Sequence, residues 1–167
     1  YEVGMSHLGL KILQHVINGM PDAICERVFT PWTDMIKLMR GEKIPLFSME
    51  SRTPIGDFDI VGFTLQYEMS YTNILEMLDL ARIPLRAADR AEDDPIIMAG
   101  GPCAYNPEPL SAFIDAFVIG DGEESTIAAV QSVQTSRAQG ENREALLLRL
   151  SQLEGVYVPR FYEAAYR

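Results

Sequence analysis

The sequence has 167 residues, the size of one domain, and its 47% hydrophobic and 23% charged residues are typical of a folded globular protein rather than a disordered chain. Fourteen Lys and Arg against 24 Asp and Glu give a net charge of −10, which argues against binding to a nucleic-acid backbone or an anionic membrane. No apolar run approaches the ~20 residues of a membrane span, and two cysteines make no secreted disulfide framework, so we expect a cytoplasmic protein.

Predicted helices and short apolar strands alternate along the chain. The spacing of apolar residues and capping residues such as Thr30 and Ser70 mark the helices, whereas β-branched and aromatic runs mark the strands. In the first half we expect a helix at 5–18, a strand at 24–30, a helix from 31 to about 41, an edge strand at 46–49 and a strand at 58–65. In the second half we expect a helix from 70 to 84, strands at 95–99 and 116–119, helices after 124 and at 141–153, and an extended strand or linker from 155.

This alternation predicts an α/β fold with a mostly parallel sheet and helices on both faces. Ligands of such sheets bind beyond the carboxyl ends of the strands. The candidate loops are therefore 30–34, 66–71, 100–107, 120–124 and, if a strand precedes it, 4–9.

The sequence opens on what reads as a strand-to-helix turn, so we expect the first strand of the sheet to be missing from it. An open edge of that kind invites pairing with another chain or with the tail at 156–161. We therefore expect a homodimer, a swapped strand or an atypical sheet.

Two glycine-marked turns are candidate ligand contacts. Gly120 and Gly122 form half of a dinucleotide-binding fingerprint, but position 125 is Ser and three carboxylates crowd the helix start that a pyrophosphate would need. A self-capped helix or a loop open to a large flat ligand fits that turn better. The turn at 100–102 (GGP) either brings a ligand close to the backbone or is a tight structural turn.

The nucleophilic and metal-ligating residues form no catalytic set. His7 and His15 lie two helical turns apart, too far to share a small metal site. His7 is either a ligand contact or, as is more usual, a surface or helix-cap residue. Cys25 and Cys103 lack the spacing of an iron–sulfur motif, and Cys103 reads as a small buried hydrophobic residue.

The segment that follows the strand at 58–65 carries an amide, a carboxylate and two aromatic rings. Tyr67 and Tyr71 stand four residues apart. They either line a cofactor or pack together at the start of the next helix.

Four segments in this order resemble the N-terminal cobalamin-binding-like domain of radical S-adenosylmethionine proteins: 1–9 (YEVGMSHLG), 58–63 (FDIVGF), 99–102 (AGGP) and 120–123 (GDGE). The resemblance is to a bacterial group labelled iron–sulfur oxidoreductases, and it covers nearly the whole chain. It implies a flavodoxin-like (Rossmann-like) three-layer sandwich over 1–154, with a linker or strand over 155–167. A downstream radical domain of the same chain would then hold the 4Fe-4S cluster and S-adenosylmethionine.

The resemblance also implies a function, because the family cleaves S-adenosylmethionine to a radical and some members use cobalamin as a methyl carrier. The expected role is a cofactor-binding or substrate-covering domain. The sequence lacks the D-x-H-x-x-G motif of many cobalamin domains, so the alternative is a structural or interaction module that has lost its ligand. No catalytic or metal-ligating residue is predicted. The residues expected to face the cofactor are Met5, Ser6, His7, Gln66, Tyr67, Gly100, Gly101, Pro102, Gly120, Asp121, Gly122 and Glu123.

Overall fold

A mostly parallel sheet organises the chain, which the computed structural model describes over residues 2–163. Its strands lie side by side in the order β1 (Ile60–Thr64), β2 (Ile96–Gly100), β3 (Ala116–Val118) and β4 (Val156–Tyr157). The pairs β1–β2 and β2–β3 are parallel, and β3–β4 is antiparallel. The predicted α/β fold with a mostly parallel sheet is confirmed.

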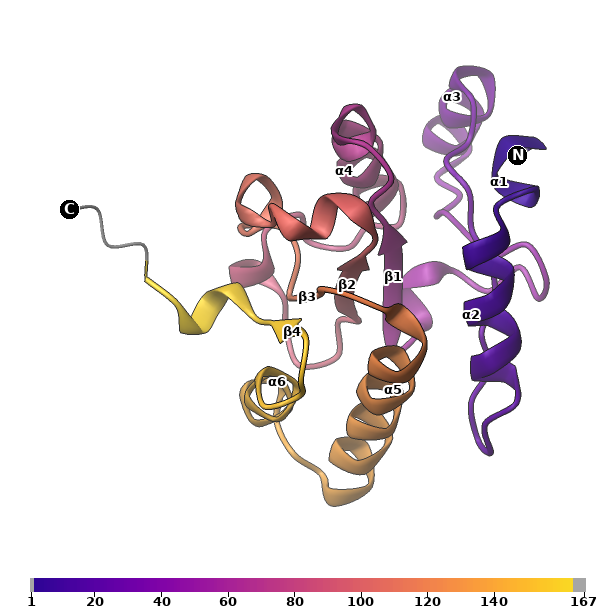
Figure 1. Ribbon diagram of the computed structural model, residues 1–167. Helices are drawn as coiled ribbons and strands as arrows, with labels where there is room; N and C mark the ends of the chain where they lie inside the picture. The colour runs from indigo at the N-terminus through magenta and orange to yellow at the C-terminus, as the bar shows by residue number, and fades with distance from the viewer. Residues whose placement is uncertain (1, 164–167) are drawn as a thin grey trace.

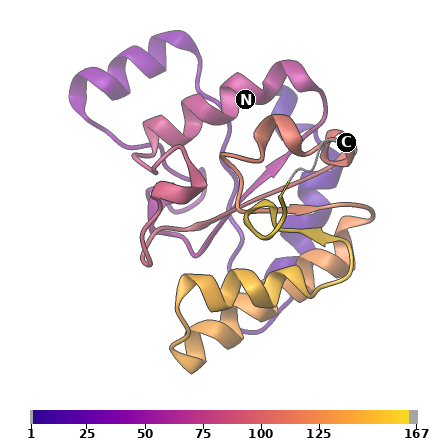
Figure 2. The same ribbon diagram turned by 90° about the vertical axis from the view of Figure 1, so that its left-hand side faces the viewer.

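Helices cover both faces of this sheet (Figures 1 and 2). The helices α3 (Thr33–Glu42) and α4 (Tyr71–Leu80) supply the core of one face, and α5 (Gly122–Gln139) and α6 (Arg143–Ser151) that of the other. The short α1 (Glu2–Met5) leads into α2 (Leu8–Asn18), which packs against α5 beside the edge strand β1. The arrangement is a three-layer sandwich, as expected.

The central strand β2 shows why its sequence is apolar throughout. Ile97 and Ala99 face the core under α3 and α4, whereas Ile96 and Met98 face the core under α5 and α6. Successive side chains of a strand point to opposite faces, so a strand covered by helices on both sides is apolar at every position. Among the helices of residues 2–163, none combines the length and the apolar composition needed to cross a lipid bilayer.

The two predicted strands at 24–30 and 46–49 do not join the sheet. The first contains neither helix nor strand, and the second makes only a single bridge, between Phe47 and Pro54. Both predictions were wrong because a strand-like composition favours an extended chain but does not bring a neighbouring strand within hydrogen-bonding distance. The cavity described below separates residues 24–28 from β1.

The expected pairing of the tail with an open strand edge is also corrected. Residues Val156–Tyr157 form β4 beside β3, at the edge of the sheet opposite β1. The tail therefore leaves β1 as an edge strand.

One buried carboxylate joins three parts of the chain at the amino ends of the strands. The Oδ2 atom of Asp115 accepts hydrogen bonds from Arg90 Nη1 (2.7 Å), from Arg143 Nη2 (2.9 Å) and from the main-chain amide of Ile97 (2.8 Å). The side chain of Asp115 is only 2% exposed. Burial lowers the pKa of Arg90, and the charge of Asp115 opposes that shift. The carboxylate fixes α6 and the segment before β2 to the start of β3.

We expect Asp115→Asn to destabilise the fold by about 3–5 kcal/mol, because it leaves two buried guanidinium groups without their counter-ion. The measurement is the free energy of unfolding in urea. The control is Asp59→Asn, which breaks an exposed ion pair with Arg137 and should cost less than about 1 kcal/mol. Equal losses in the two variants would contradict this role of Asp115.

Candidate functional site

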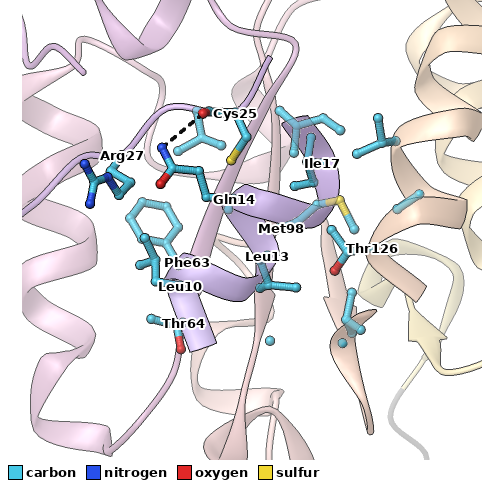
Figure 3. A pocket seen from close by; sticks show the side chains of 18 of the residues that line it. Leu10, Leu13, Gln14, Ile17, Cys25, Arg27, Phe63, Thr64, Met98 and Thr126 are labelled. Atoms are coloured by element: carbon cyan, nitrogen blue, oxygen red, sulfur yellow. Dashed lines mark hydrogen bonds between the residues drawn. The ribbon is translucent and has the colours of Figure 1, made fainter. Parts of the chain in front are cut away.

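A cavity of about 490 Å³ lies between α2, the segment 22–28, β1 and α5. Figure 3 shows its mostly apolar wall, to which α2 contributes Leu10, Leu13 and Ile17 and the sheet contributes Phe63 and Met98. The cavity runs along the free edge of β1 and reaches the loops at the carboxyl ends of the strands. The sequence predicted ligand binding at those loops, and not along the free edge of β1.

Seven of the twelve residues predicted to face a cofactor line this cavity: His7, Gln66, Gly100, Gly101, Gly120, Gly122 and Glu123. The other five, which are Met5, Ser6, Tyr67, Pro102 and Asp121, are not part of its wall. The glycine-marked turns thus gather at one end of the sheet and are not scattered over the molecule.

The two glycine turns differ in what they leave open. Gly120 has φ +111°, and a Cβ there would meet no atom within 4 Å. At Gly122 the nearest atom to such a Cβ would be Leu13 Cδ2, at 3.9 Å. Gly101 has φ +106°, but its Cβ would lie 3.0 Å from the carbonyl oxygen of Leu65. The 120–122 turn is therefore open to a ligand, whereas Gly101 is needed for close packing of the backbone.

His7 caps a helix. Its Nδ1 atom accepts a hydrogen bond of 3.1 Å from the main-chain amide of Leu10, in the first turn of α2. This was the more usual of the two roles considered for it. Its Nδ1 atom is thereby occupied, although the residue still borders the cavity.

The aromatic pair Tyr67 and Tyr71 does not line the cavity. Tyr71 packs against the core below α4 beside Cys103, and its pKa is raised, mainly by burial. Tyr67 is exposed. Cys103 is itself packed against that core, as its small apolar character suggested.

Large apolar side chains stand exposed on three loops at the carboxyl ends of strands or of the strand-like segment 24–28. Trp32 is 80% exposed, Met69 84% and Tyr105 72%, and Tyr67 beside Met69 is 57% exposed. We call these four residues the apolar crown. Apolar side chains exposed on neighbouring loops are candidates for contact with another domain. Sequence reasoning missed all but Tyr67, although each follows a predicted strand and so carried a positional signal.

The wall formed by residues 24–28 is held by Glu50. Its carboxylate accepts hydrogen bonds from the Arg27 amide (2.8 Å), from Arg27 Nε (2.7 Å) and from Gln14 Nε2 (3.0 Å). Gln14 also donates to the carbonyl oxygen of Cys25, the bond drawn in Figure 3. Burial, followed by the charges of Glu50 and Glu26, raises the pKa of the Cys25 thiol. Cys25 is therefore kept protonated and poorly nucleophilic.

The site contains no cluster of metal ligands. Within residues 2–163, no three His, Cys, Asp or Glu side chains are placed to hold one ion. The carboxylates of Asp121, Glu123 and Glu124 are exposed at the start of α5, where they interact favourably with the helix dipole and repel phosphate.

Comparison with known proteins gives a family and one distant relative. The family described as "Radical SAM proteins, N-terminal" matches residues 9–159. An uncharacterized protein of Methanocaldococcus jannaschii is 30% identical over 89 residues, which are 53% of this chain and 18% of the relative. The chain therefore spans less than a fifth of that relative's length. No solved structure gives a significant match.

The contact between Glu50 and residues 24–28 is expected to depend on pH. Burial raises the pKa of Glu50, but the hydrogen bonds from Arg27 and Gln14 outweigh it and the pKa lies below 4.5. The carboxylate therefore stabilises the fold fully above pH 4.5, and this contribution is lost as the pH falls through the lowered pKa. We expect Glu50→Gln to flatten the acid side of a plot of Tm against pH. The control Glu144→Gln, at an exposed position of α6, should keep the wild-type slope.

Proposed function

This chain belongs to the family of N-terminal domains of radical SAM proteins. We propose that the loops at the carboxyl ends of its strands cover the catalytic domain of such a protein. That catalytic domain would hold the 4Fe-4S cluster and S-adenosylmethionine. The observation that carries the proposal is the apolar crown beside the glycine-lined end of the cavity. In the isolated domain the apolar crown is exposed to water, and contact with the catalytic domain would bury it.

The opposite end of the sheet is less suited to an interface of this kind. That end carries the exposed carboxylates of Asp57, Asp59, Glu92 and Asp93, and its buried carboxylate, Asp115, has its partners within the domain. The loops at the carboxyl ends, by contrast, combine exposed aromatic rings with a glycine turn that is open to solvent. We infer that the loops at the carboxyl ends of the strands form one wall of the space in which the radical reacts.

We further propose that the flat ligand at this wall is cobalamin, which supplies a methyl carrier when bound. Gly120 and Gly122 leave room beside the backbone, and Gln66 and Glu123 offer an amide and a carboxylate to the amide groups around a corrin ring. His7 Nδ1 accepts the hydrogen bond that caps α2, which in the neutral imidazole puts the proton on Nε2, and His15 does not line the cavity. We therefore propose no histidine ligand to cobalt from this domain. In this proposal Gln66 and Glu123 contact the amide groups at the periphery of the corrin, and no residue of the domain coordinates the cobalt.

The competing function is an interaction module without a ligand. It is favoured by two observations: His7 serves as a cap, and the turn at Gly101 is required by backbone packing. Both functions use the apolar crown as the interface with the catalytic domain, so corrin binding distinguishes them.

The interface is tested by cysteine labelling in the full-length protein. We expect Tyr105→Cys to react with a maleimide at least about tenfold more slowly than Leu148→Cys, because a covered thiol is inaccessible. Within the domain Tyr105 is 72% exposed and Leu148, on α6, is 50% exposed. Faster labelling at position 105 than at 148 would show that the crown is not covered.

The ligand is tested by adding hydroxocobalamin to the full-length protein and measuring retained corrin absorbance after gel filtration. We expect Gly122→Leu to weaken binding about tenfold or more, a loss of roughly 1.4 kcal/mol, because the new side chain occupies the open rim. The control is Gly41→Leu on α3, where a Cβ would meet no atom within 4 Å. Wild-type protein that retains no corrin would favour the ligand-free module.

A further inference from the structure

The edge strand β1 has one row of main-chain groups directed toward the cavity. The carbonyl of Asp59 accepts from the amide of Ile96 (2.9 Å), and the amide of Leu65 donates to the carbonyl of Gly100 (2.7 Å). Odd-numbered residues thus bond to β2. Because main-chain groups alternate between the two edges of a strand, those of Ile60, Gly62 and Thr64 face the other way. Within residues 2–163 they have no hydrogen-bond partner on that side.

The opposite wall of the cavity has a matching row. Cys25 bonds to Asn18 through both its amide (2.7 Å) and its carbonyl (3.1 Å). Arg27 bonds through its amide to Glu50 and through its carbonyl to the amide of Met49 (2.7 Å). The main chain of residues 25 and 27 is therefore satisfied on the outer side. By the same alternation, the main-chain groups at 24, 26 and 28 point into the cavity.

In the described part of the chain, the main-chain groups at 24, 26 and 28 have no partner either, so two unpaired rows of donors and acceptors face each other across the cavity. Figure 1 shows that the chain runs from the end of α2 to the start of α3 in the direction of the β1 arrow. This space is lined by Leu13 and Ile17 of α2 (Figure 3) and by Phe58 and Phe63, which pack against the core under α3 and α4. A single extended segment in this space would have apolar walls on both faces and hydrogen-bond partners on both edges.

We propose that the cavity between β1 and residues 24–28 receives one apolar β-strand, parallel to both, from the parent polypeptide on the N-terminal side of Tyr1. This strand would convert residues 24–28 into a sheet strand and β1 into an internal one. It would fill the space along β1 and leave the open glycines at 120 and 122 outside it.

Three observations favour this occupant. Residues Val156–Tyr157 are already paired with β3 at the far edge, so the described tail is committed elsewhere. A second copy cannot pair its β1 with this one, because α2 and residues 24–28 flank the space. The helix α1 begins at the end of the molecule toward which β1 points (Figure 1), so a parallel strand would end where α1 starts.

The test is residue-resolved hydrogen exchange in the full-length parent protein. If the strand is present, the amides of Gly62 and Thr64 should exchange within about tenfold of the rate of Phe63, whose amide faces β2. The amides at 26 and 28 should be protected as well. Amides of the residues directly before Tyr1 should be slow at consecutive positions, since both edges of that segment would be bonded.

Two results would overturn the proposal. Fast exchange at Gly62 and Thr64 beside slow exchange at Phe63 would show that β1 is an edge strand in the parent protein. Slow exchange at Gly62 and Thr64, together with fast exchange throughout the segment before Tyr1, would show that another segment or chain occupies the space. Neither result depends on corrin binding, so this proposal can fail while the proposed function stands.

Discussion

The carboxylate of Asp115 joins the start of β3 to the segment before β2 and to α6. It holds the guanidinium groups of Arg90 and Arg143 and the amide of Ile97 at one buried oxygen. Burying such charges is costly, so they must remain together. The arrangement ties the amino end of the sheet together through buried ion pairs, although Arg143 Nε has no hydrogen-bond partner within residues 2–163.

The carboxyl end has the opposite character. Its loops carry exposed Trp32, Met69 and Tyr105, and the glycine at 120 adopts a conformation open to solvent. Below these loops, unsatisfied strand edges border the cavity. The domain thus has a buried ion-pair cluster at the amino ends of its strands. Exposed apolar side chains at the carboxyl ends and the free edge of β1 are the surfaces for which we propose contacts with other parts of a larger protein.

Several elements could be predicted because their signals are local. The apolar stripe and Asn18-Gly19 located the end of α2, and the apolar runs placed β1, β2 and β3 to within two residues. The segment at 24–30 misled because strand composition says nothing about whether a pairing neighbour exists. The glycines at 101 and 120 looked alike in sequence, yet one packs against Leu65 and the other faces open space.

By itself, the sequence determined the α/β class, the parallel character of the sheet and the end at which glycine-marked loops would meet. These follow from side-chain periodicity and from chain alternation, which are properties of neighbouring residues. Only the tertiary structure decided that Asp115 has two buried arginine partners and that residues 24–28 stand apart from β1. Each of these depends on distances between segments far apart in the chain, which no local pattern encodes.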